Sequence, residues 1–315
     1  MSVSVDPHRF REESVMDRSA DATAFIVGPA RSGTSLLYKA LCLHPEAAYV
    51  SNWVARYPGV PQVAVLNRLA RAFPSRRRDA WFADGANAYV YGTARSLARR
   101  SFPTPVEGEP LYTRSGVARP GGPAPRSVAP ATELPKAFAT IRRFGGGSVL
   151  VSKRIANNLR VPLLADVFPQ ARFVFLVRDG RAVAASLSRV DWWPDSHVWW
   201  YGGSPRRWAE EGRDPWEICA RNWVEELEQI GTGLAGVPET QVLQLRYEDL
   251  VARPVATLEG VAEFVGLAPD AAWRRGIAEL AFPDRREAWR DALDPAAVDR
   301  ISRIQQEELA RYGYA

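Results

Sequence analysis

The chain has 315 residues, of which 46% are hydrophobic and 24% are charged, and this is enough for a large buried core in one α/β domain. A formal charge of +5 suits an anionic ligand, but the charge is spread too widely to predict a nucleic-acid partner. Only two cysteines are present, Cys42 and Cys219, and neither lies in a C-x-x-C motif, so we expect buried free thiols in place of a disulfide framework or a zinc site. No apolar run is long enough to span a membrane, so we predict a cytoplasmic protein with no membrane partner and no metal.

The elements expected along the chain are those of a doubly wound α/β fold. Residues 1–20 are charged, lack the apolar segment of a signal peptide and are expected to form a mobile leader before a domain over 21–315. The uninterrupted apolar run at 23–27 predicts a strand buried on both faces of a parallel sheet, and further strands are expected at 148–153, 171–177 and 241–246. Helical spacing of apolar residues predicts helices at 34–43, 182–190 and 216–231, and further helices that begin at Pro254 and at Asp294-Pro295. We therefore predict a P-loop-like domain with one central parallel sheet flanked by helices.

A glycine-rich turn joins the first strand to the first helix. The run Gly28-Pro29-Ala30-Arg31-Ser32-Gly33-Thr34-Ser35 has the G-x-x-x-x-G spacing of a phosphate-binding loop. The converging N–H groups of such a loop, and the positive end of the next helix dipole, attract an oxyanion. A nucleotide triphosphatase would carry lysine where this chain has Thr34, and the nearest cation here is Arg31. We therefore expect a site for a phosphate-like group without the usual γ-phosphate and magnesium apparatus.

A second anion-binding feature follows the strand at 171–177. Arg178 comes directly after this strand, and Ser186 lies about two turns into the next helix. Since ligands of parallel sheets bind beyond the carboxyl ends of the strands, the two side chains can close on one anion. Arg178 would supply a forked donor and Ser186 a hydroxyl. In the alternative interpretation, Arg178 pairs with Asp179 at the surface.

Together the two features resemble the two PAPS (3′-phosphoadenosine-5′-phosphosulfate) signatures of the sulfotransferase superfamily, within a similarity over about residues 23–310. The resemblance implies that the loop residues hold the 5′-phosphosulfate and that Arg178 and Ser186 hold the 3′-phosphate. It also implies that Tyr247, in Leu245-Arg246-Tyr247-Glu248-Asp249-Leu250, lies near the adenine. Arg290, in the segment 289–295, would reach the 3′-phosphate. The loop residues concerned are Arg31, Ser32, Gly33, Thr34 and Ser35.

The resemblance implies transfer of the sulfuryl group to a hydroxyl or amine of a small-molecule acceptor, with PAP as the second product. Arg31 and the loop N–H groups would neutralise the leaving oxygen, and Lys153 would assist at the reacting centre. The family's usual bases are missing, because the histidine position is Ile155 here and the glutamate positions are Ser51 and Asn52. The remaining candidates are His197, which can titrate near neutral pH, and the nearby Asp191 and Asp195.

Two insertions, over about residues 50–130 and 190–216, are expected to form the acceptor pocket. The first contains a Pro-, Gly-, Ser- and Arg-rich stretch at 114–131 that is typical of a surface loop. The second is dense in tryptophan, and the pairs Trp192-Trp193 and Trp199-Trp200 favour a lid over an apolar pocket. The run Arg76-Arg77-Arg78 is expected to be a solvated face.

Two other functions stay open from the sequence. A P-loop small-molecule kinase would use ATP and magnesium, but the Walker lysine is missing and the Arg178–Ser186 pair has no place in it. A catalytically inactive PAP-binding protein would explain the missing bases. The sequence predicts neither the identity of the acceptor nor the oligomeric state.

Overall fold

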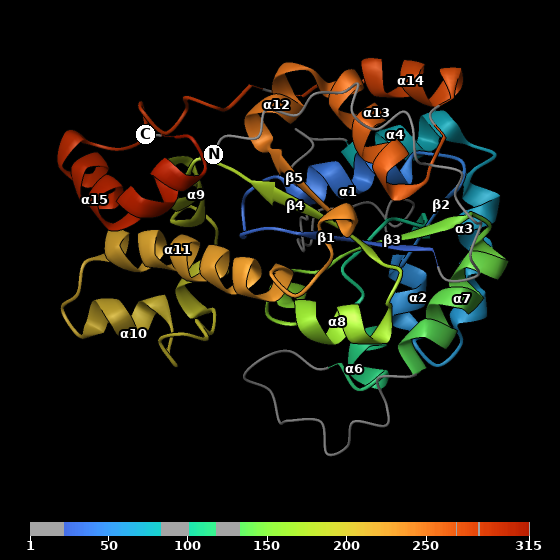
Figure 1. Ribbon diagram of the computed structural model, residues 1–315, viewed down its shortest axis with the longest axis horizontal. Coiled ribbons are helices and arrows are strands. Elements are labelled where there is room, and N and C mark those ends of the chain that lie inside the picture. The colour runs from blue at the N-terminus through green and yellow to red at the C-terminus, as the bar shows by residue number, and fades with distance from the viewer. Residues whose placement is uncertain (1–21, 83–100, 118–132, 269, 283, 315) are drawn as a thin grey trace.

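A computed structural model describes residues 22–82, 101–117, 133–268, 270–282 and 284–314 (Figure 1). The leader expected at 1–20 and nearly all of the surface loop expected at 114–131 lie outside these residues.

The centre of the molecule is a five-stranded, wholly parallel sheet with the order β2-β3-β1-β4-β5. The strands are β1 (Thr23–Val27), β2 (Ala47–Tyr49), β3 (Val149–Lys153), β4 (Arg172–Val177) and β5 (Val242–Arg246). Ile26 of β1 is in register with Lys153 of β3 and with Val174 of β4, so the carboxyl ends of the three central strands reach one edge together. This arrangement confirms the predicted parallel α/β sheet.

Alternate residues of β1 enter two different cores, which explains why the strand reads as one unbroken apolar run. Phe25 and Val27 pack with helices on one face of the sheet, and Ala24 and Ile26 pack with helices on the other. Both faces are thus covered, as a parallel sheet requires.

The helices divide into three groups (Figure 1). One sheet face carries α7 (Glu133–Gly145), α8 (Val161–Val167) and α11 (Pro215–Leu234). The other carries α1 (Thr34–Cys42), α4 (Pro74–Phe82), α12 (Tyr247–Ala252), α13 (Pro254–Val265) and α14 (Ala271–Ala278). A third core joins α9 (Gly180–Leu187), α10 (Pro205–Glu210) and α15 (Pro295–Arg311) to α11 beyond the sheet.

Short elements complete the described chain. Near β2 these are α2 (Asn52–Arg56), η1 (Pro61–Ala64), α3 (Val65–Ala70) and α6 (Glu109–Arg114), and elsewhere η3 (Ile155–Leu159), η4 (Trp193–Asp195) and η5 (Glu239–Gln241). Among the described helices, none has both the length and the apolar character needed to cross a bilayer.

The tryptophan-rich stretch is largely a packing element. Trp193 and Trp208 are buried in the third core, and Trp208 lies against Trp200 and Tyr201 with ring centroids 5.9 and 5.0 Å away. Trp192 is 49% exposed, because it packs edge-on against Trp193 from the solvent side. Within the pairs, Trp193 is thus buried in the third core and Trp200 packs against that core, whereas Trp192 faces solvent.

The run Arg76-Arg77-Arg78 is not a uniformly solvated face, so this expectation was wrong at its centre. Arg77 is 3% exposed, stacks on the Trp81 ring at 4.5 Å and donates to the carbonyl oxygens of Cys42 and Leu43. It thereby satisfies carbonyl groups at the C-terminal end of α1, which have no partner within the helix.

Candidate functional site

The phosphate-binding loop lies between β1 and α1 in a strained conformation. Arg31 has a φ of 69°, and no other non-glycine residue in the described chain has a positive φ. Gly33 has a φ of 91°, and a Cβ atom there would lie 2.5 Å from the Tyr247 ring, so glycine is needed at this position. A loop held in such conformations is typical of a ligand-binding turn.

The donors of this loop fit an oxyanion. No side chain caps α1, so the N–H groups of its first turn point into the loop without an acceptor inside the helix. The Ser32 hydroxyl is buried and has no hydrogen-bond partner among the described residues. A buried donor without an acceptor is costly, and a bound phosphate or sulfate oxygen would satisfy it.

Arg178 brings the second predicted feature against the first. Its Nη1 donates to the Arg31 carbonyl oxygen over 3.1 Å, and its guanidinium stacks on the Tyr247 ring at 4.4 Å. Trp223 fixes the backbone by donating from Nε1 to the Arg178 carbonyl oxygen over 3.1 Å. Residues from the loop, β4 and α12 thus meet at one point beyond the carboxyl ends of the strands.

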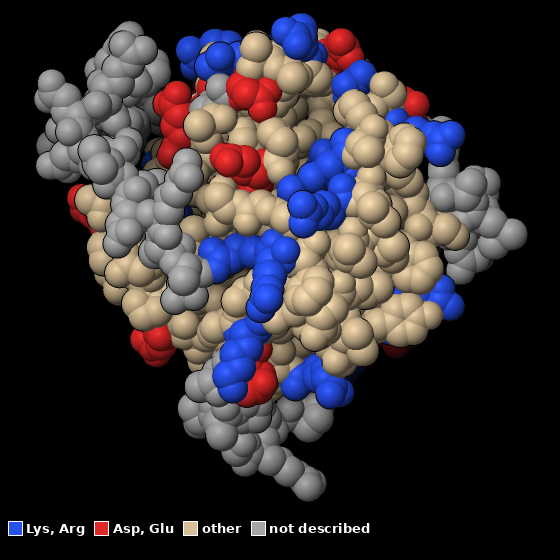
Figure 2. Space-filling model, turned by 90° about the vertical axis from the view of Figure 1, so that its right-hand side faces the viewer, with Lys and Arg blue, Asp and Glu red and all other residues tan. Residues whose placement is uncertain are grey.

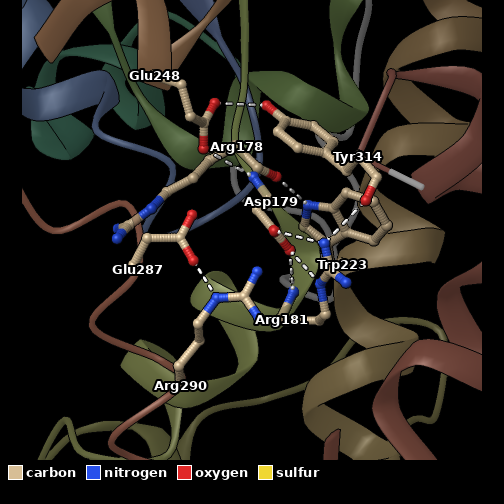
Figure 3. A network of polar contacts seen from close by, with 8 residues as sticks. All are labelled: Arg178, Asp179, Arg181, Trp223, Glu248, Glu287, Arg290 and Tyr314. Atoms are coloured by element: carbon tan, nitrogen blue, oxygen red, sulfur yellow. Dashed lines mark hydrogen bonds and ion pairs between the residues drawn. The ribbon is translucent and has the colours of Figure 1, made fainter. Parts of the chain in front are cut away.

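Arg178 is available to an anion. Asp179 pairs with Arg181 at 2.8 Å, and not with Arg178, so the alternative surface pair does not form (Figure 3). No carboxylate within the described residues forms an ion pair with Arg178, and its buried Nε has no hydrogen-bond partner. The predicted role of Arg178 as an unneutralised forked donor is compatible with this geometry.

Three arginines gather around this point. Burial lowers the pKa of Arg31, and the positive charges of Arg178 and Arg285 lower it further. Arg285 was not predicted; its carbonyl oxygen accepts a hydrogen bond from Arg178 Nη2 over 3.1 Å. Like charges held this closely repel one another, so an anion between them would be stabilised strongly.

Ser186 and Arg290, which were both predicted to bind the 3′-phosphate, contact residues other than Arg178. Ser186 Oγ accepts a hydrogen bond from Arg31 Nε over 3.1 Å, and so lies next to the loop arginine. Arg290 is exposed and forms an ion pair with Glu287 (Figure 3). Its guanidinium also stacks on the Trp289 ring at 4.6 Å. In the segment expected to reach the 3′-phosphate, Arg285 is therefore the arginine with a direct contact to Arg178.

A buried glutamate, Glu226, was not predicted from the sequence and fixes the loop through hydrogen bonds. Glu226 Oε2 accepts from Ala30 N over 3.1 Å and from Asn158 Nδ2 over 3.0 Å, and Oε1 accepts from Asn222 Nδ2 over 2.9 Å. Asn158 also pairs with both backbone groups of Gly28. Burial raises the pKa of Glu226 to about 6, although all three hydrogen bonds and the Lys153 charge oppose the shift.

Lys153 ends β3 beside the loop and is held by a second unpredicted carboxylate. Its Nζ lies 2.6 Å from Glu107 Oε1, and the side chains of Lys153 and Glu107 are 4% and 15% exposed. Glu107 Oε2 also accepts from the Ile155 N–H over 3.4 Å. The proximity of Lys153 to the buried Glu226 places this ion pair next to the phosphate-binding loop.

Glu107 reaches this place because its segment runs beside residues 50–52. Val106 N donates to the Val50 carbonyl oxygen over 2.9 Å, and Ser51 forms an antiparallel bridge with Pro105. Ser51 itself caps α2 through Val54 N, so its hydroxyl has a structural role. Nothing local marks Glu107, since its partner Lys153 is 46 residues away in the chain.

His197 lies on the exposed segment between η4 and α10. None of the contacts of the described residues connects it to Arg31 or Lys153. Asp195 forms an exposed ion pair with Arg206 at 2.7 Å, and Asp191 is also exposed. The three candidate bases from the tryptophan-rich stretch therefore belong to a surface segment.

The site as a whole combines an anion-binding loop, a cluster of arginines and an adjacent Lys–Glu pair. Such a set can hold two anionic groups of one ligand and place a carboxylate next to the group that reacts. No group of three or more His, Cys, Asp or Glu side chains that could hold a metal ion is found within the described ranges.

Comparisons with known proteins agree with this geometry. Residues 24–271 match the family described as "Sulfotransferase family". The chain is 25% identical over 322 aligned residues to omega-hydroxy-beta-dihydromenaquinone-9 sulfotransferase Stf3 of Mycobacterium tuberculosis, covering 94% of this chain and 76% of the relative. It is 26% identical to carbohydrate sulfotransferase 1 of Danio rerio over 185 residues, covering 50% of this chain and 41% of that one.

Solved structures show the same fold. Sulfotransferase STF9 from Mycobacterium avium superposes with a TM-score of 0.58 at 14% identity, covering 93% of this chain and 77% of that one. Sulfotransferase STF1 from Mycobacterium tuberculosis superposes with a TM-score of 0.55 at 16% identity, covering 91% and 77%. At these identities the likeness concerns the fold.

Proposed function

Because this chain belongs to the sulfotransferase family, we propose that it transfers the sulfuryl group of PAPS to a hydroxyl group of an apolar small-molecule acceptor. A PAPS-dependent sulfotransferase is what the two anion-binding motifs predict, and the family match and the relatives confirm that prediction. The residues that hold the donor, the catalytic base and the acceptor class are our proposals.

The observation that supports the donor site most directly is the meeting of Arg31, Arg178 and Arg285 without a neutralising carboxylate. The loop residues Ser32 to Ser35 would hold the 5′-phosphosulfate, and Arg178 with Arg285 would hold the 3′-phosphate. Tyr247 packs against both Gly33 and Arg178, so it sets the separation between the two anion sites. Ser186 would orient Arg31 through the hydrogen bond they share.

PAPS supplies an activated sulfuryl group whose leaving oxygen gains negative charge during transfer. The Arg31 guanidinium, the first N–H groups of α1 and the Lys153 ammonium would stabilise that charge. Their fixed positions provide the stabilisation without reorganisation, as in phosphoryl transfer, where positioning and electrostatics carry the catalysis. Arginine at position 31 binds the anion but donates no proton, because a guanidinium group remains charged in proteins.

We propose Glu107 as the general base that accepts the proton of the acceptor hydroxyl. Its carboxylate lies 2.6 Å from Lys153 Nζ and remains partly exposed, so it is next to the reacting centre and open to an acceptor. Glu107 Oε2 accepts from Ile155 N, and Pro105, two residues before Glu107, forms a bridge with Ser51. Positions 155 and 51 are the two places where relatives are expected to carry a histidine or a glutamate. Two segments distant in sequence would thus restore a base that the local motifs lack. His197 becomes the second candidate.

The proposed acceptor class rests on the name of a relative. The relative aligned over 94% of this chain is named for a hydroxylated menaquinone, an apolar molecule that carries its acceptor hydroxyl on a long chain. We propose an acceptor of this general kind, an apolar alcohol that enters between residues 50–57 and the segment before α6. We also propose a cytoplasmic location, which the buried free thiols of Cys42 and Cys219 support.

The donor proposal is tested by thermal unfolding with PAP, with 5′-AMP and with ATP plus magnesium. A ligand at a hundred times its Kd adds about 2.7 kcal/mol of stability, so PAP should raise the Tm clearly and 5′-AMP much less. Arg178→Ala should abolish that difference, whereas Arg303→Ala, a substitution on the outer surface of α15, should keep it. Stabilisation by ATP with magnesium alone would instead support the kinase alternative.

The base proposal is tested by turnover with labelled PAPS and a long-chain primary alcohol. Glu107→Gln should lower kcat by about 10² to 10⁴ while the Tm shift with PAP persists, because the base contributes to chemistry and not to donor binding. His197→Ala should leave kcat within twofold of the unaltered protein. The opposite pattern would assign the base to His197, and PAP binding without turnover on any alcohol or phenol would support the inactive-protein alternative.

A further inference from the structure

Exposed hydrophobic side chains gather on one side of the molecule. Of the seven large hydrophobic residues that are exposed among the described residues, six lie within 57–73 or at Phe144. Leu69 is 61% exposed, Phe73 is 51% and Val65 is 42%. Scattered apolar residues on a surface need no explanation, but a concentration of this kind marks a place where the protein binds something.

Unpaired arginines lie among these side chains. The chain has six arginines and no acidic residue from 47 to 78. The Arg76 guanidinium stacks on the exposed Phe73 ring at 5.5 Å, and the Arg143 guanidinium lies 5.9 Å from the Phe144 ring. No carboxylate in the described parts of the chain pairs with Arg68, Arg76 or Arg143. We call the following set the α3–α7 patch: Val65, Arg68, Leu69, Phe73, Arg76, Arg143 and Phe144.

The patch spans α3, the C-terminal turn of α7, and the segment from Phe73 to the first turn of α4. Val65 and Leu69 are one helical turn apart on α3, and α3 packs against α7, whose C-terminal turn carries Arg143 and Phe144. Gly146, just after α7, lies close to the Arg68 side chain. α3 and α7 lie on the right-hand side in Figure 1, and Figure 2 shows a band of Lys and Arg side chains across that face, among uncharged residues.

We propose that the α3–α7 patch docks the protein peripherally on an anionic membrane surface. Unpaired guanidinium groups fit lipid phosphates and acidic headgroups, while Leu69, Phe73 and Phe144 would enter the apolar boundary beneath them. Leu69 and Phe144 lie near the C-terminal ends of α3 and α7. A bilayer is deformable, so exposed side chains of this kind can insert into it without a matching pocket. This departs from the sequence-based expectation of no membrane partner.

Two other occupants fit the patch less well. A second copy of this chain would bring the same patch against itself in a two-fold dimer, and arginine would then face arginine. An acidic protein would satisfy the charges but would need a groove for Leu69 and Phe73. Docking on a membrane does not depend on the proposed donor, base or acceptor, so its test uses binding and not activity.

The proposal is tested by co-sedimentation of the full chain with vesicles of phosphatidylcholine alone and with vesicles that contain about one third phosphatidylglycerol. The protein should bind the anionic vesicles and lose most of that binding between about 0.1 and 0.5 M salt, because salt screens exposed charges. Each arginine near an anionic surface contributes roughly fivefold in affinity, so R68E/R76E should bind at least tenfold more weakly.

The apolar part is tested separately. L69S/F73S should also bind at least tenfold more weakly, while Trp192→Ser, which removes an exposed aromatic residue outside the patch, should bind like the unaltered protein. R206E/R207E is the matched charge control, since those arginines are exposed on α10. Circular dichroism should show that all variants keep the fold.

Three results would overturn the proposal. Absence of binding to either kind of vesicle would leave an acidic protein as the alternative occupant. Equal loss of binding in R68E/R76E and R206E/R207E would show that net charge and not the patch is responsible. A concentration-dependent dimer that L69S/F73S abolishes would assign the patch to self-association.

Discussion

At the scale of the residue, Glu226 shows how one buried carboxylate fixes the backbone of an anion-binding loop. Both of its oxygens accept hydrogen bonds, and the donors are Ala30 N, Asn158 Nδ2 and Asn222 Nδ2. Asn222 cannot reverse its amide freely, because its Oδ1 accepts from Trp200 Nε1 over 3.2 Å. Glutamine at position 226 would place an NH₂ group against one of these donors, so only a carboxylate satisfies the whole arrangement.

The raised pKa of Glu226 predicts how stability depends on pH. The pKa of Glu226 is about 6 in the native protein and near the ordinary value of 4.5 in the unfolded chain. The native protein therefore binds this proton more tightly than the unfolded chain does. The contribution of protonation is therefore complete below about pH 4.5 and is lost as pH rises through 6, about 2 kcal/mol in all. The Glu226→Gln variant has no such proton to lose. Urea unfolding should therefore show that, as pH rises from below 4.5 to above 6, the free energy of unfolding of this variant gains about 2 kcal/mol relative to that of the unaltered protein. Glu228→Gln, at an exposed position, should follow the unaltered protein; parallel curves for all three would contradict the prediction.

At the scale of the element, β1, β3 and β4 were predicted because each contains a short apolar run and is buried along nearly its whole length. β5 was also predicted, although it is an edge strand whose residues are mostly only partly buried. β2 was missed because three residues at the edge of the sheet are too few for a pattern. The anion loop and Arg178 were predicted because strand–loop–helix order fixes their positions. Glu107, Glu226 and Arg285 were not, because their contacts join residues between 46 and 196 positions apart in the chain.

The end of α1 provides a test at this scale. Arg77 donates to two carbonyl groups there and stacks on Trp81, so Arg77→Met would leave buried acceptors without partners. We expect this substitution to lower the free energy of unfolding by about 2 to 4 kcal/mol. The neighbouring exposed Arg76→Met should change it by less than about 0.5 kcal/mol. Denaturant titrations measure both, and equal effects would show that Arg77 has no special structural role.

At the scale of the whole molecule, the fold holds Arg31, Arg178 and Arg285 close together beyond the carboxyl ends of the central strands. Burial and mutual repulsion lower the pKa of Arg31, which shows that the fold maintains a concentrated positive charge there. A charge of this kind attracts anionic ligands over distances of about a Debye length, roughly 10 Å at 0.1 M salt.

The donor should therefore bind with a clear dependence on salt. We expect KM for PAPS to rise several-fold between about 0.05 and 0.5 M sodium chloride. Arg285→Gln should raise KM at low salt and flatten this dependence, because it removes one charge of the cluster. Arg303→Gln, which removes a distant surface charge, should leave the slope unchanged. A slope that is the same in all three proteins would show that the cluster does not steer the donor.

The stack of Arg178 on Tyr247, itself packed on Gly33, has a consequence for turnover. The proposed contacts of Arg178, Arg285 and the loop are made mostly to phosphate groups that stay on the nucleotide after the sulfuryl group has left. Contacts of equal strength before and after the reaction tighten binding without speeding chemistry. The spent nucleotide should then be a potent competitive inhibitor, and its departure should limit the steady state after a fast first cycle.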